Sequence, residues 1–130
     1  MTVASLLATS TVFGGMVLFS FGFAAFIFAY LEPRVAGSLI RSAFHWYYTF
    51  VLVGSAIAAF MLIFVDTFSA QLLLLTALFG ILSQFILMPR INMARDTEGK
   101  EALFSRLHRT SVLINFAQLA LLVWALIRFV

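Results

Sequence analysis

Four long apolar stretches run along this 130-residue chain, separated by short segments that hold nearly all of its charge. A helix rises about 1.5 Å per residue, so each stretch is long enough to cross a hydrocarbon layer of roughly 30 Å. The pattern therefore predicts an all-α integral membrane four-helix bundle with up-and-down topology, forming a single transmembrane domain over residues 1–130. The predicted helices cover about residues 11–31, 43–65, 70–88 and 107–127.

Composition excludes the class of soluble globular domains. Hydrophobic residues make up 64% of the chain and charged residues 10%, and the mean hydropathy is +1.12. Soluble domains are roughly 45–50% apolar and about 25% charged. The chain has no cysteine, which excludes disulfides, thiolate catalysis and cysteine-based metal sites. We expect no enzymatic activity, because no nucleophile is paired with a base and an orienting acid.

The basic residues predict how the chain is threaded. Seven of the eight Lys and Arg side chains lie in or beside the first and third connections, and only Arg128 belongs to the other side. The positive-inside rule places both basic connections in the cytoplasm and both chain ends in the periplasm of a bacterial inner membrane. Because these cations flank apolar runs, the expected partner is the lipid bilayer and not nucleic acid. We expect contacts with anionic head groups from Arg34, Arg41, Arg95, Arg106 and Arg109.

Two short segments suggest that the chain consists of related halves. "LEPRV" (31–35) and "LMPRI" (87–91) each place a Pro-Arg pair after an apolar stretch and before a histidine, His45 or His108. Such a repeat favours two parallel helical hairpins related by an axis along the membrane normal. The alternative, that Pro-Arg simply ends a helix at the membrane surface, stays open.

Polar side chains form a line on the last predicted helix. Four of them, His108, Ser111, Asn115 and Gln118, fall within an arc of about 80° at 100° per residue. On the second predicted helix, His45 and Tyr48 repeat the spacing of His108 and Ser111. An unsatisfied polar group in lipid costs several kcal/mol, so these groups are expected to face the bundle interior near the cytoplasmic side. The predicted polar cluster comprises His45, Tyr48, Arg90, Asn92, His108, Ser111, Asn115 and Gln118.

The segment "FSRLHRTSVLIN" (104–115), with "FGG" in the first helix and the charged connection before the last, resembles a known family. It is similar to the small bacterial membrane proteins of domain of unknown function 4149, which are related to eukaryotic transmembrane protein 205. The resemblance is strongest at His108, Ser111 and Asn115. It implies a four-helix membrane protein. The eukaryotic relative is associated with platinum-drug resistance and suspected of transport.

Three functions remain open on the sequence alone. The leading hypothesis is an accessory or structural component of a membrane assembly, as a homo-oligomer or within a larger complex. The second is a cofactor site in the bundle core, in which His45 and His108 bind haem b axially or hold a metal ion. The third is transport of a small solute or metal ion along Asn115 and Gln118. The identity of any cofactor or metal is unknown at this stage.

Overall fold

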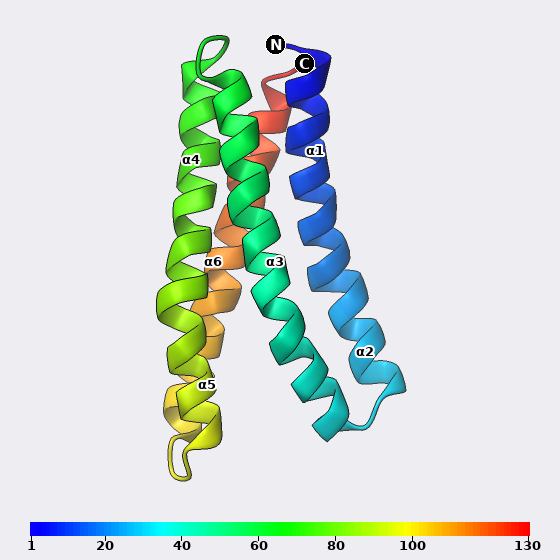
Figure 1. The fold of residues 1–130 in the computed structure, drawn as a ribbon, viewed down its shortest axis with the longest axis vertical. Coiled ribbons are helices and arrows are strands. Elements are labelled where there is room, and N and C mark those ends of the chain that lie inside the picture. The colour runs from blue at the N-terminus through cyan, green and yellow to red at the C-terminus, as the bar shows by residue number, and fades with distance from the viewer.

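The computed structural model describes residues 1–130 as four long antiparallel helices, with both chain ends at the same end of the bundle (Figure 1). All four helices are long and apolar enough to cross a membrane, so the predicted all-α four-helix membrane bundle is confirmed. In chain order the elements are α1 (Val3–Val17), the π-helical segment η1 (Leu18–Phe23), α2 (Ala24–Tyr30), α3 (Pro33–Leu62), α4 (Thr67–Leu82), the π-helical segment η2 (Ser83–Leu87), α5 (Met88–Asp96) and α6 (Glu101–Ile127).

Two ends of the bundle are distinguished by their connections. We call the end with the connections at residues 31–32 and 97–100 the basic end, and the end with both chain termini and the connection at 63–66 the terminal end. The helices are longer than the predicted apolar stretches: the first begins at Val3 instead of near residue 11, and α3 begins at Pro33 instead of near residue 43. The prediction followed uncharged residues, but backbone hydrogen bonding continues past the point where charges begin.

The two prolines occupy different places, which corrects one prediction. Pro33 is at the start of α3, where its missing N–H would have had no partner anyway. Pro89 was expected to end a helix, but it lies inside one, directly after η2. A proline within a helix cannot donate to the carbonyl four residues earlier, and a widened π turn accommodates that loss. The two hairpins are parallel, but their Pro-Arg pairs are not equivalent and give no support to a repeat.

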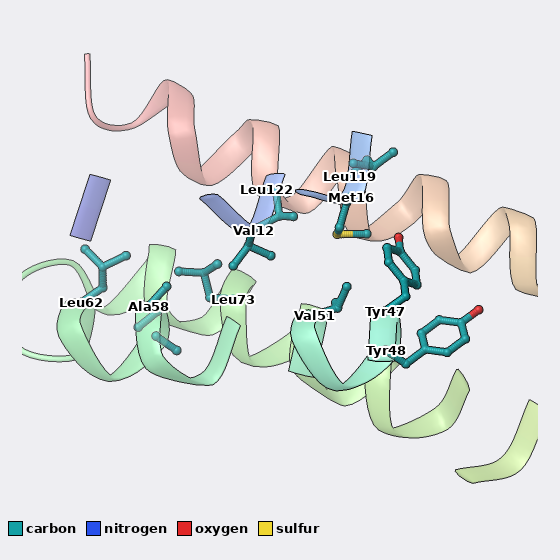
Figure 2. Packing of buried hydrophobic residues seen from close by; sticks show 12 residues of the cluster. Val12, Met16, Tyr47, Tyr48, Val51, Ala58, Leu62, Leu73, Leu119 and Leu122 are labelled. Carbon is teal, nitrogen blue, oxygen red and sulfur yellow. The ribbon is translucent and has the colours of Figure 1, made fainter. Parts of the chain in front are cut away.

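The packed core lies in the half of the bundle nearer the terminal end. Figure 2 shows a row of core side chains from α1, α3, α4 and α6 that ends at Tyr47 and Tyr48. Glycines let these helices approach closely: a Cβ added to Gly54 would lie 2.7 Å from Cγ2 of Val12, and one added to Gly15 would lie 2.5 Å from the Phe50 ring. Close backbone approach of this kind maximises dispersion contacts in lipid.

An ion pair fastens the chain end to the α3–α4 connection at the terminal end. Arg128 donates to both carboxylate oxygens of Asp66, at 2.9 and 3.0 Å, and its guanidinium lies 4.9 Å from the Phe68 ring centroid. Ser69 Oγ also donates to Asp66. The hydrogen bonds from Arg128, followed by that from Ser69, hold the pKa of Asp66 well below its usual range.

Candidate functional site

A cavity of about 310 Å³ lies at the basic end, below the packed core. We call it the main cavity. The α2–α3 hairpin end and the α5–α6 hairpin end diverge there (Figure 1), and residues from η1, α2, α3, α5 and α6 line the space between them. None of the lining residues is acidic, while two are arginines and one is a histidine. The main cavity is therefore apolar for most of its surface, and its polar lining residues are neutral or basic.

A hydrogen-bonded triangle connects three helices at the inner end of the main cavity. The Tyr47 hydroxyl on α3 donates to Asn115 Oδ1 on α6 at 2.5 Å, and Asn115 Nδ2 donates to Ser20 Oγ on η1 at 3.0 Å. Ser20 Oγ and the Tyr47 hydroxyl are 3.5 Å apart. The three groups satisfy one another within the bundle, so they stabilise the junction of the first, second and fourth spans.

Cationic groups surround the mouth of the main cavity at the basic end. Arg41 on α3 donates through both terminal nitrogens to Asp96, at 2.9 and 3.2 Å, while its Nε is buried and has no partner. Arg95 and His108 are exposed, and neither side chain hydrogen-bonds to the protein. The ring of Phe104 orients both: the Arg95 guanidinium lies 5.2 Å from its centroid, and the His108 ring stacks on it at 5.9 Å and 11°.

Phenylalanines form the side of the main cavity between the first and fourth spans. Phe21 on η1 and Phe116 on α6 lie with ring centroids 5.9 Å apart, and they are 56% and 50% exposed. Phe28 on α2 is similarly exposed and also lines the cavity. Since these rings line the cavity and are also about half exposed on the outer surface of the bundle, the main cavity is bounded on this side by apolar side chains at the bundle surface.

A second cavity, of about 360 Å³, lies between α3 and the η2–α5 segment. We call it the side cavity. Its polar side chains include His45, whose Nδ1 lies 3.2 Å from Gln84 Nε2, and Gln84 Nε2 also donates to Thr49 Oγ1 at 3.1 Å. Four residues line both cavities and form the wall between them: Arg41, Tyr48, Met88 and Asn92.

The structure brings together only part of the predicted polar cluster. His108, Ser111 and Asn115 line the main cavity, although Ser111 Oγ donates to the carbonyl oxygen of His108 in its own helix. Gln118 is fully buried in the core, where its Nε2 donates to the Thr76 carbonyl oxygen at 2.9 Å. Arg90 is exposed and lines neither cavity.

The two histidines are not brought to a shared position. His108 lines the main cavity and His45 lines the side cavity, on the other side of the wall formed by Tyr48 and its neighbours. A haem held by both imidazoles needs them on opposite faces of one ring, and this arrangement does not provide that geometry. The bis-histidine cofactor site stays a prediction without support from the arrangement of the helices.

Sequence reasoning placed Gln84 among the polar groups facing the bundle interior, but it missed Ser20, Tyr47 and Phe104 as parts of these sites. Tyr47 had a usable signal, because Val51 and Ser55 follow it at four-residue steps and both are fully buried. Ser20 and Ala24 are small residues four apart, which indicates a packing face, but the π turns of η1 change which face a side chain occupies, so the bond to Asn115 was not predictable.

Comparison with known proteins identifies the family. The model of the family described as "Domain of unknown function (DUF4149)" matches residues 7–100. The chain belongs to this family. The match covers the first three spans and ends before α6, so it does not test the part of the resemblance that rests on His108, Ser111 and Asn115. Neither the curated proteins nor the solved structures gave a match.

Proposed function

We propose that this membrane protein binds an anionic amphipathic molecule in its main cavity. The head group would lie among Arg41, Arg95 and His108, and the apolar chain would lie against the phenylalanines at the bundle surface. One observation carries this proposal: a single cavity combines a cationic mouth, no acidic lining residue, and an aromatic side at the bundle surface.

The charges at the mouth favour a phosphate or carboxylate head group. Guanidinium groups match the geometry of these anions, and an imidazole adds a further donor. The terminal nitrogens of Arg41 are occupied by Asp96, so Arg95 and His108, whose side chains make no hydrogen bond to the protein, are the groups free to meet the ligand. The mouth is at the end of the bundle that carries most of the basic residues, which we place on the cytoplasmic side, where anionic head groups attract them.

The size of the main cavity limits how much of a lipid it can hold. Cavities for small ligands measure about 300–1,000 Å³, and 310 Å³ is at the lower end of that range. A single acyl chain fits this description better than a complete two-chain lipid. A second chain would extend past Phe21, Phe28 and Phe116 into the surrounding bilayer.

Lipid titration followed by native mass spectrometry tests the proposal. Oleoyl lysophosphatidic acid, a single-chain anionic lipid, should bind the purified protein more tightly than monoolein, which has an uncharged head group. Arg95→Gln should weaken binding of the anionic lipid roughly fivefold, the upper end of what an exposed ion pair contributes. Lys100→Gln is the control, since it removes the same unit of charge at the basic end from an exposed side chain that lines neither cavity. Equal binding of both lipids, or equal effects of both substitutions, would refute the proposal.

Two of the three functions predicted from the sequence, the accessory role and transport, remain compatible with a bound lipid. An accessory role in a larger membrane assembly stays a prediction. Transport also stays a prediction, although the main cavity ends at the triangle of Ser20, Tyr47 and Asn115. Beyond it, fully buried side chains such as Met16 and Leu122 fill the half nearer the terminal end. Binding therefore has more structural support than passage.

A further inference from the structure

We infer that the side cavity is a second, separate lipid site, which takes a zwitterionic head group joining a phosphodiester to a primary ammonium, as in phosphatidylethanolamine. This inference goes beyond the proposed function, because it concerns a different cavity, a different histidine and a different ligand. It rests on the hydrogen-bonding groups that the protein leaves unused between α3 and η2–α5.

The donors in the side cavity follow from the fixed roles of Gln84 and Thr49. Thr49 Oγ1 donates to the His45 carbonyl oxygen, so it accepts from Gln84 Nε2. An amide nitrogen can only donate, and therefore His45 Nδ1 also accepts from Gln84. A neutral His45 consequently carries its proton on Nε2, which makes no hydrogen bond to the protein. His45 Nε2–H and the buried, unpartnered Nε–H of Arg41 are the two donors available to a phosphodiester.

The side cavity also offers acceptors, and these decide the class of ligand. Asn92 Oδ1 is buried and has no partner, and Gln84 Oε1 accepts no hydrogen bond from the protein. A simple anion would use the donors and leave the buried Asn92 oxygen unsatisfied, which is costly for a buried group. A head group with an N–H donor next to its phosphate satisfies both sets. A choline head group has the same charges but no N–H to donate.

The position of the side cavity points to a membrane lipid as the source of this head group. The cavity lies at the basic end of two membrane-spanning helices, and its rim includes the exposed Pro89. Trp46, next to His45, is 73% exposed, and tryptophans facing outward from membrane helices lie at the level of the lipid head groups. A lipid in the adjacent leaflet therefore has its phosphate at the depth of the unused donors.

The test compares lipids that differ only in the methylation of the amine. Native mass spectrometry of the purified protein should show phosphatidylethanolamine binding roughly three- to tenfold more tightly than phosphatidylcholine of the same chains, the range for one or two net hydrogen bonds. Affinity should fall stepwise through the monomethyl and dimethyl forms. This series needs no altered protein. Equal affinities across the series would overturn the inference.

Matched substitutions separate this site from the main cavity. His45→Phe and Asn92→Leu should both reduce the ethanolamine preference toward one, whereas His108→Phe should leave it intact, because His108 lines only the main cavity. Conversely, His108→Phe should weaken lysophosphatidic acid binding and His45→Phe should not. If the preference for phosphatidylethanolamine survives His45→Phe, the second site is overturned and the proposed function is unaffected. If the protein binds lysophosphatidic acid no more tightly than monoolein but keeps its ethanolamine preference, only the proposed function is refuted. Free phosphoethanolamine tests whether the ligand is soluble. If it displaces phosphatidylethanolamine at equal concentration, the site belongs to a soluble ligand and a lipid site is refuted.

Discussion

The triangle of Ser20, Tyr47 and Asn115 makes a quantitative prediction about stability. Interhelical side-chain hydrogen bonds in membrane proteins contribute about 0.6 kcal/mol on average and at most about 1.7. The 3.5 Å contact between Ser20 and Tyr47 is too long to be counted, so Tyr47→Phe removes one bond, to Asn115, and Asn115→Leu removes that bond together with the one to Ser20. We therefore expect losses of about 0.6 and about 1.2 kcal/mol in the free energy of unfolding.

Combining Tyr47→Phe with Asn115→Leu tests whether the two side chains share a hydrogen bond or contribute independently to stability. Because the bond between Tyr47 and Asn115 is lost only once, the double variant should lose about 1.2 kcal/mol, not the sum of about 1.8. The coupling energy is therefore about 0.6 kcal/mol. Reversible unfolding in mixed micelles of dodecyl sulfate, followed by circular dichroism, measures each corner of the cycle.

A second cycle provides the control. Gln118 lies on the same helix as Asn115 but hydrogen-bonds to the Thr76 carbonyl oxygen, so Tyr47→Phe and Gln118→Leu should be additive. If the cycle of Tyr47 and Asn115 is as additive as this control, the triangle does not stabilise the bundle. The inner end of the main cavity would then be held only by packing.

Three further predictions concern other parts of the molecule. Gly54→Leu should lower the free energy of unfolding by about 1–3 kcal/mol through overpacking, whereas Gly14→Leu should change it little, since nothing lies within 4 Å of a Cβ at Gly14. The pair of Asp66 and Arg128 should stabilise the fold fully above about pH 4 and lose its contribution as the pH falls through the lowered pKa of Asp66. Thermal unfolding measured at decreasing pH should show this loss of stability. In Asp66→Asn this part of the pH dependence should be absent. Phe104→Leu should weaken lysophosphatidic acid binding a few-fold in titrations, because the ring orients both exposed cations at the mouth.

The architecture was predictable because it follows from composition and spacing. Four apolar stretches of membrane length and a strong bias in charge leave few alternatives to a four-helix bundle. The ends of the helices were harder to predict, because the bilayer determines where apolar residues stop but not where backbone hydrogen bonding stops. Pro89 shows the difference: the proline ends an apolar stretch, yet the π turn before it lets the helix continue to Asp96.

The sites were predictable only where a helix is regular. Asn115 and Ser111 share a face of α6, and ordinary helical spacing was sufficient to group them with His108. Spacing along one helix says nothing about the rotation of its neighbours, so it placed His45 and His108 in one centre, whereas the structure has them in two cavities. The partner of Asn115 across the bundle, Ser20, depends on a π segment that leaves no mark in the hydrophobic pattern.

The uneven packing along the bundle axis has a mechanical consequence. The main core cluster lies toward the terminal end of the bundle, while both cavities lie toward the basic end. Filling or emptying them changes the cross-sectional area of the protein in one monolayer only. Under the proposal that both cavities take lipid, a lateral pressure that differs between the two monolayers would act directly on the occupancy of these sites.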